Sequence, residues 1–155
     1  MKIYLDTNII HSWFRNSIRA KREDNLLKEP EIVKFLKNNR ITLIVSEITK
    51  IEIARFLKSE LSAKEEEIEE LWNTFLTSFD INFLEIDIVN FKELYSLVLQ
   101  IPTRKKTIVN LMHLQIAKQE NVWFLTGENK LITRYKKYYD KSISYPELRK
   151  KLSSS

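Results

Sequence analysis

A carboxylate, a hydroxyl and an amide stand together where the first apolar run of the chain ends, and their oxygens could hold a divalent cation. The run is Ile3–Leu5, and the polar residues that follow it are Asp6, Thr7 and Asn8. The apolar pattern then resumes at a helical spacing, so we expect a buried strand to meet a helix at Asp6. Burying a carboxylate there is costly unless a partner or a metal satisfies it. Asp6 is also a good helix N-cap residue, and capping alone would explain it.

Two further carboxylates are candidates for the same site. Glu128 follows the apolar run VWFL, residues 122–125, through Thr126 and one glycine. Glu128 thus follows its predicted strand as Asp6 follows the first one. Glu52 lies in the segment SEITKIEIARF, amid isoleucines. Each has an ordinary alternative, because Thr126 could cap a helix and Glu52 could pair with Arg55 on a surface.

An amide and a histidine share one face of the helix expected over residues 107–120. The face is defined by the helical spacing of four residues, which are Asn110, His113, Leu114 and Ala117. We expect His113 to be a packed, hydrogen-bonded histidine and not a general base. Asn110 could equally be an ordinary surface residue.

These residues belong to apolar strands that alternate with helices. The expected strands cover 2–6, 41–45, 82–86 and 122–125, with a short edge strand at Ile143. The expected helices cover 8–19, 30–37, 46–61, 62–79, 87–100, 107–120 and 128–139. This order indicates an α/β fold, a three-layer sandwich with a central, mostly parallel sheet of four or five strands. Ligands of such sheets collect beyond the carboxyl ends of the strands, where the three carboxylates are expected.

Composition excludes several other kinds of site. The 155 residues fit a single domain over 1–150 and a flexible tail over 151–155. Cysteine is absent, which excludes disulfides and thiolate metal sites, and a single glycine excludes glycine-rich phosphate loops. No apolar run is long enough to span a bilayer, so we expect a cytoplasmic protein without membrane contact. The net charge of +5 favours polyanionic partners without identifying them.

Three carboxylates and an amide that meet at one edge of a sheet would form a pocket of hard oxygen ligands. Such a pocket suits Mg²⁺ or Mn²⁺ and not Zn²⁺. Without a cation, the clustered carboxylates would repel one another. With one, they could direct an activated water at a phosphodiester bond.

Four stretches together resemble the PIN-domain family of small ribonucleases, which includes VapC-type toxins. They are IYLDTNII, SEITKIEIARFL, NLMHLQIAK and FLTGENKLI. The resemblance implies a metal-dependent endoribonuclease that binds RNA, an antitoxin protein as a possible partner, and a homodimer. It implies catalytic positions at Asp6, Glu52, Asn110 and Glu128, metal ligands at Asp6, Glu52 and Glu128, and supporting residues at Thr7, Asn8 and Thr126.

Two positions depart from the pattern that the resemblance implies. Glu128 stands where an aspartate is usual, which keeps the charge. Asn110 also stands where an aspartate is expected, and its amide offers an oxygen without charge. The substitution, natural or introduced, would weaken or disarm the nuclease; the alternative is a catalytically silent scaffold that binds RNA or a protein. A phosphatase of the haloacid-dehalogenase type would need a second aspartate at Asn8, which disfavours it.

Two basic segments are candidates for RNA contact. Arg104, Lys105 and Lys106 precede the helix that carries the amide. The segment RYKKYY, residues 134–139, alternates cations with aromatic rings that could stack on bases. Its cations are Arg134, Lys136 and Lys137. The alternative for this second segment is a solvated helix end, where cations are favourable.

Overall fold

All five strands of the computed structural model are parallel and form one sheet in the order β3-β2-β1-β4-β5. The strands are β1 (Lys2–Leu5), β2 (Thr42–Ser46), β3 (Ile81–Leu84), β4 (Trp123–Leu125) and β5 (Ser142–Ile143). The structure describes residues 1–39, 41–79, 81–85, 91–100 and 105–154. The sheet confirms the expected α/β architecture, and β1 lies at its centre.

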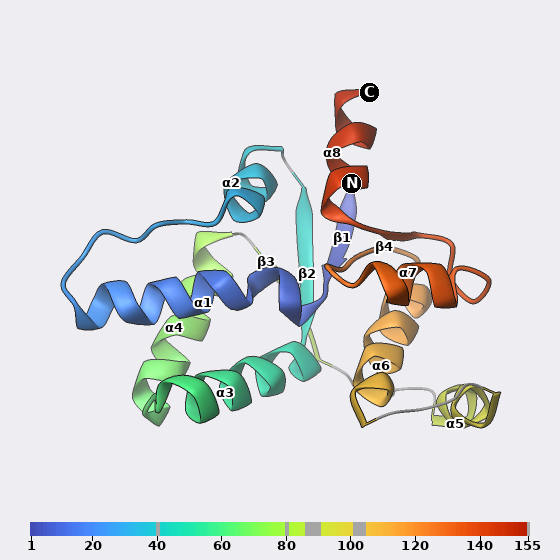
Figure 1. Ribbon diagram of the computed structural model, residues 1–155, viewed down its shortest axis with the longest axis horizontal. Coiled ribbons are helices and arrows are strands. Elements are labelled where there is room, and N and C mark those ends of the chain that lie inside the picture. Colours follow the sequence, from blue (N-terminus) through green and yellow to red (C-terminus); the bar gives the residue numbers. More distant parts are fainter. Residues whose placement is uncertain (40, 80, 86–90, 101–104, 155) are drawn as a thin grey trace.

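Helices cover both faces of the sheet, as Figure 1 shows. They are α1 (Thr7–Arg22), α2 (Glu31–Asn38), α3 (Glu47–Leu61), α4 (Glu65–Ser78), α5 (Phe91–Gln100), α6 (Lys105–Gln119), α7 (Asn129–Tyr135) and α8 (Tyr145–Ser153). In Figure 1, α1, α3 and α4 lie on one side of the strands, and α5, α6 and α7 lie on the other. This arrangement is the three-layer sandwich that the sequence predicts.

Alternation along the strands divides the apolar side chains between two cores. In β1, Ile3 and Leu5 pack into the core that α1, α3 and α4 cover, whereas Tyr4 packs into the core beneath α6. Both faces of the sheet are therefore buried, which explains why the strand sequences are continuously apolar.

The carboxyl ends of three neighbouring strands bring distant polar residues to one edge of the sheet. Asp6 follows β1, Ser46 ends β2, and Thr126 follows β4. The backbone N–H of Asp6 donates to the carbonyl of Leu125 at 2.9 Å, so the ends of β1 and β4 are held together. Because β1 has β2 on one side and β4 on the other, the chain order reverses at this point.

Helix α4 begins later than the sequence predicts. Ser62, the predicted start of this helix, adopts a left-handed conformation (φ 48°) and ends α3. The backbone N–H of Lys64 donates to Glu67 Oε2 at 2.9 Å. In α3 itself, Ile51 is 68% exposed.

The C-terminal part differs from the expectation in two helices. Helix α7 ends at Tyr135 and does not continue to Tyr139, whose hydroxyl is buried against the carbonyl of Ala117 at 3.0 Å. Helix α8 was not expected, although Glu147 accepts a hydrogen bond from the backbone N–H of Ser144 at 2.8 Å, as in an ordinary capping box. The last turn of α8 lies in the segment 151–155, and its mobility stays a prediction.

Two further observations concern other predictions from the sequence. The cap expected at residue 87 lies outside the described residues. Within the described ranges, no helix combines the length and apolar character needed to cross a bilayer.

An aromatic cluster joins α1 to α4 and anchors the larger core. Phe75 of α4 is buried, and its ring centroid lies 5.2 Å from Trp13 and 5.0 Å from Phe14, both in α1. These ring contacts hold α1, and with it the polar residues at its N-terminus, against the remainder of the fold.

Phe75→Ala should lower the free energy of unfolding by about 3–5 kcal/mol, because it leaves a cavity among these rings. The urea midpoint measured at constant m-value tests this expectation. Ile51→Ala, on the exposed face of α3, is the control and should change stability by less than about 0.5 kcal/mol. Equal losses in the two variants would contradict the assignment of the core.

Candidate functional site

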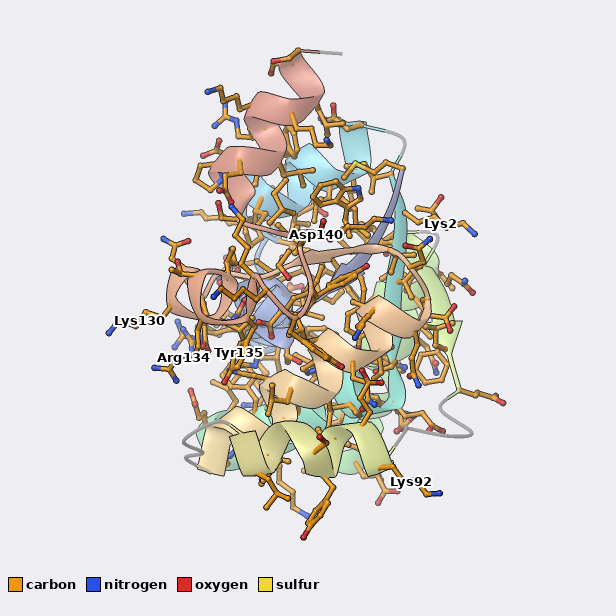
Figure 2. The ribbon with its side chains drawn as sticks, turned by 90° about the vertical axis from the view of Figure 1, so that its right-hand side faces the viewer. Lys2, Lys92, Lys130, Arg134, Tyr135 and Asp140 are labelled. Carbon is orange, nitrogen blue, oxygen red and sulfur yellow. The ribbon has the colours of Figure 1, made fainter. Side chains whose placement is uncertain are left out.

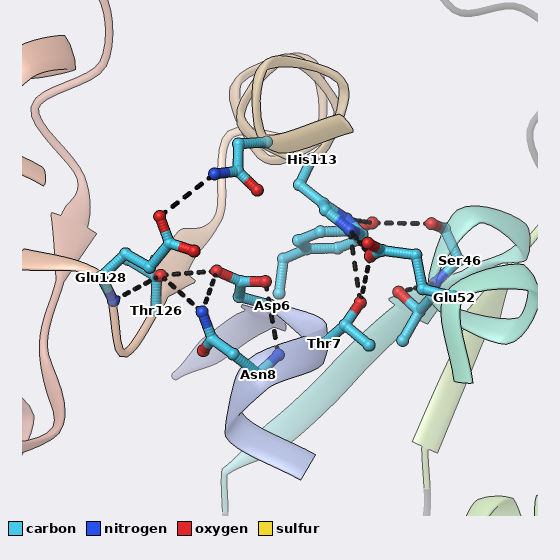
Figure 3. Close-up of polar contacts among 11 residues, drawn as sticks. Asp6, Thr7, Asn8, Ser46, Glu52, His113, Thr126 and Glu128 are labelled. Atoms are coloured by element: carbon cyan, nitrogen blue, oxygen red, sulfur yellow. Dashed lines mark hydrogen bonds and ion pairs between the residues drawn. The ribbon is translucent and has the colours of Figure 1, made fainter. Parts of the chain in front are cut away.

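Asp6 is the centre of a hydrogen-bond network at the end of β1 and β4 (Figure 3). Its side chain is only 4% exposed. Oδ2 accepts from the hydroxyl of Thr126 at 2.5 Å and from Nδ2 of Asn8 at 2.8 Å. Oδ1 accepts from the backbone N–H of Asn8 at 3.5 Å, so Asp6 is also the N-cap of α1. The capping interpretation and the site interpretation therefore apply to the same carboxylate.

The only glycine of the chain lies against Asn8. The backbone N–H of Gly127 donates to Oδ1 of Asn8 at 2.9 Å. A Cβ atom at position 127 would lie 3.2 Å from that oxygen, which is closer than most such contacts. The small residue therefore allows the loop after β4 to approach the start of α1.

Glu128 and Asn110 meet at the exposed side of this network. The backbone N–H of Glu128 donates to Oγ1 of Thr126 at 3.0 Å. Its carboxylate Oε2 accepts from Nδ2 of Asn110 at 3.2 Å. The side chain of Glu128 is longer than that of the aspartate usual at this position, and it reaches from the end of β4 to α6.

Glu52 lies on the other side of Asp6 in Figure 3 and has its own donors. Oε2 accepts from Oγ1 of Thr7 at 2.5 Å and from Nε2 of His113 at 2.7 Å. The pairing with Arg55, which was the alternative for Glu52, is not what holds this carboxylate. His113 is buried and hydrogen-bonded, as its position on α6 predicts.

Sequence reasoning missed two members of the site, Tyr4 and Ser46. The hydroxyl of Tyr4 lies 2.8 Å from Nδ1 of His113 and 2.6 Å from Oγ of Ser46. A tyrosine within a buried apolar run is a signal, because its hydroxyl needs a partner there. The sequence could not identify the partner, which lies on a helix far along the chain.

The two carboxylates have opposite electrostatic environments. Burial raises the pKa of Asp6, although His113 and the hydrogen bonds from Thr126 and Asn8 act against the rise. Burial also acts to raise the pKa of Glu52, but hydrogen bonds from His113 and Thr7 outweigh it and hold this pKa below its ordinary value. The charged form of Asp6 therefore lacks compensation that Glu52 has.

The donor set fits a hard divalent cation. Asp6, Glu52 and Glu128 supply carboxylate oxygens, and Asn110 supplies an amide oxygen. None of the lysine and arginine ion pairs in the described part of the chain involves these carboxylates. Within that part, no three acidic or histidine side chains are gathered closely enough to ligate one ion as they stand.

The remaining candidates lie away from this network. Arg134, Lys136 and Lys137 are exposed, on and just after α7. The stacking expected of the neighbouring aromatic rings is wrong for Tyr135 and Tyr139, which are buried. Residue 104 and the side chains of residues 105 and 106 lie outside the described part of the structure.

Comparison with known proteins gives one positive result. A family model described as "PIN domain" matches residues 3–137, which include every residue of the network and, apart from Lys2, all elements from β1 to α7. A comparison with curated proteins gives no match.

The free energy of unfolding of Asp6→Asn should increase relative to that of the unchanged protein as the pH rises. Because burial raises the pKa of Asp6 above 3.8, the native state binds this proton more tightly than the unfolded chain does. The unchanged protein therefore loses stability as the pH rises above that value, until the native pKa is passed. The variant has no such titration. A tenfold difference in proton affinity is worth about 1.4 kcal/mol, which sets the scale of the effect.

Urea unfolding in EDTA between about pH 4 and 7 measures this difference. Asp140→Asn, at an exposed position, controls for removal of a carboxyl group elsewhere. A loss of stability by Asp6→Asn relative to the unchanged protein as the pH rises would contradict the expectation.

Proposed function

The chain belongs to the PIN-domain family, a family of nuclease-type fold, and from this we propose that it is a metal-dependent endoribonuclease. The observation that carries the proposal is the buried carboxylate of Asp6. It lies at the carboxyl ends of parallel strands between Glu52 and Glu128 (Figure 3), without a cationic side chain paired to it in the described structure. A buried charge of this kind calls for a cation.

Asp6, Glu52 and Glu128 would hold Mg²⁺ or Mn²⁺. When bound, the ion would supply an activated water and neutralise charge on the phosphodiester. Thr126 and Asn8 fix Asp6 by donating to the same carboxylate oxygen, Oδ2. Oδ1, whose one donor among the described residues is 3.5 Å away, is the oxygen better placed to bind a cation.

Asn110 supports a second candidate function. It stands beside Glu128 with an amide in place of a charge, which lowers the negative charge available to a divalent cation. A catalytically silent scaffold that binds RNA or a protein would tolerate this amide, whereas an efficient nuclease would not. Cleavage activity separates the two functions.

The cations around α7 support RNA as the substrate. Lys130, Arg134, Lys136 and Lys137 are exposed, and none of them has an ion-pair partner within the described ranges. Figure 2 shows Lys130 and Arg134 pointing outward from the helix. Phosphates are the natural partners of such a group, and α7 begins directly after Glu128.

The cations of α1 differ in this respect. Arg15, Lys21 and Arg22 pair with glutamates of α3 and α4. Their charges are therefore balanced within the protein, and they offer a matched comparison with the group around α7.

We extend the proposal to a toxin-like role in the cytoplasm, with a homodimer and an antitoxin protein as partners. Its support is the resemblance of the four sequence stretches to VapC-type toxins. The exposed apolar side chains of Ile51, Tyr95 and Leu99 are surfaces that a partner chain would cover.

The unchanged protein should cleave single-stranded RNA slowly with Mn²⁺, and EDTA or Asp6→Asn should abolish the cleavage. Asn110→Asp should increase the apparent Mn²⁺ affinity at least about tenfold, because a carboxylate beside the ion adds more than about 1.4 kcal/mol. Asn73→Asp, on the exposed face of α4, adds the same charge elsewhere and is the control. Gel assays over a range of Mn²⁺ concentrations measure both effects.

Absence of cleavage in the unchanged protein and in Asn110→Asp would contradict the nuclease proposal and favour the silent scaffold. Cleavage that persists in Asp6→Asn would show that the activity does not belong to this site.

Replacing Arg134, Lys136 and Lys137 together by alanine should weaken RNA binding and flatten its dependence on salt. Each phosphate contact on a single strand contributes about 0.7 to the slope of log K against log salt, so three contacts contribute about 2. The control replaces Arg15, Lys21 and Arg22, which removes the same charge. Fluorescence anisotropy in EDTA gives the affinities without cleavage, and equal effects of the two triple variants would contradict a specific role for the α7 cations.

A further inference from the structure

A continuous chain of hydrogen bonds leads from β2 to the carboxylate of Glu52 through a tyrosine of β1. Oγ of Ser46 lies 2.6 Å from the hydroxyl of Tyr4, and that hydroxyl lies 2.8 Å from Nδ1 of His113. Nε2 of His113 lies 2.7 Å from Oε2 of Glu52. Ser46 and Tyr4 are fully buried, and His113 is 1% exposed. Glu52, at the end of the chain, is 26% exposed.

For a neutral imidazole ring, the partners determine the direction of every hydrogen bond. The carboxylate of Glu52 can only accept, so Nε2 of His113 carries a proton. In the neutral ring Nδ1 is then an acceptor, and the hydroxyl of Tyr4 must donate to it. The oxygen of Tyr4 is left to accept from Ser46.

Packing alone does not explain the hydroxyl of Tyr4. Its ring lies in the smaller core, with its centroid 6.1 Å from that of Phe124. A phenylalanine would fill the same space, whereas a buried hydroxyl is costly unless it is bonded. Tyr4 and Asp6 are two residues apart on β1 and its continuation, and the strand period directs both toward the α6 side of the sheet.

Within the part of the chain that the structure describes, one oxygen of Glu52 has no hydrogen-bond donor. The hydroxyl of Thr7 and Nε2 of His113 both donate to Oε2. The two donors fix the orientation of the carboxylate, and Oε1 remains for another ligand. An imidazole held at both nitrogens is a stiffer donor than one held at a single nitrogen.

We propose that Tyr4 is a positioning residue for the metal site: its hydroxyl holds the imidazole of His113, which in turn holds Glu52 with Oε1 presented to the cation. The inference rests on the proposed function, since it assigns a purpose to Glu52 within that site. Groups that orient metal ligands in this way commonly change metal affinity by about 10–100-fold when removed.

The histidine ring gives a readout that needs no metal and no activity. The chain has two histidines, so ¹⁵N spectra of the ring nitrogens are simple to assign with His11→Gln. In the metal-free protein, at a pH where the ring of His113 is neutral, Nε2 should be the protonated nitrogen and Nδ1 a hydrogen-bonded acceptor. In Tyr4→Phe the Nδ1 signal should move toward that of a free acceptor, while the signals of His11 stay in place. A proton on Nδ1 of His113 in the unchanged protein would overturn the inference without any variant.

Mn²⁺ binding, measured from the electron paramagnetic resonance signal of the free ion, provides the second readout. Tyr4→Phe should weaken Mn²⁺ binding about tenfold or more. Tyr139→Phe is the matched control, because it removes another buried hydroxyl of the same core, bonded to the carbonyl of Ala117 and remote from Glu52. It should leave the Mn²⁺ affinity unchanged.

Three results would distinguish the possible failures. Equal Mn²⁺ affinities in Tyr4→Phe, Tyr139→Phe and the unchanged protein would overturn the positioning role and leave the proposed function intact. Equal weakening of Mn²⁺ binding in Tyr4→Phe and Tyr139→Phe would show that the hydroxyl of Tyr4 has only a structural role. This result would also overturn the positioning role. Failure of the unchanged protein to bind Mn²⁺ at all would overturn the proposed function, and the inference with it.

Discussion

The buried carboxylate of Asp6 is the constraint around which this edge of the molecule is organised. It caps α1, its backbone N–H ties the end of β1 to β4, and its side chain accepts from Thr126 and Asn8. These bonds orient the carboxylate without neutralising it, and burial still raises its pKa. A charge kept at this place would cost the fold stability, as expected for the cation site proposed above.

Regular elements, and not long loops, hold the residues around that charge. Helix α6 contributes His113 to the site, and the residues that flank it in sequence or on the same face, such as Leu114 and Ala117, are fully buried in the smaller core. A shift of α6 would therefore disturb packing as well as hydrogen bonding. Sites built on such elements keep their geometry more closely than sites built on mobile segments.

Sequence reasoning identified the strand-end residues because their signal is local. Asp6 and Glu128 each interrupt or follow an apolar run, and parallel strands bring such positions to one edge of the sheet. The partners of Glu52 could not be predicted in the same way, since His113 belongs to another helix and Tyr4 is hidden within an apolar strand. The end of α7 was misjudged because Tyr139 continues a helical pattern but packs its hydroxyl against backbone carbonyls instead. Helix α8 was overlooked although its cap, Ser144, shows the ordinary spacing to Glu147.

The strand order also decides when the site can exist during synthesis. β1 leaves the ribosome first, yet its partners are β2 on one side and β4, which begins at Trp123, on the other. A nascent chain that ends before β4 contains Asp6 and Glu52 but lacks Leu125, Thr126 and Glu128, which complete the network. Such a partial chain lacks residues that the proposed cation site needs. The chain must therefore be synthesised through β4 before this network can assemble.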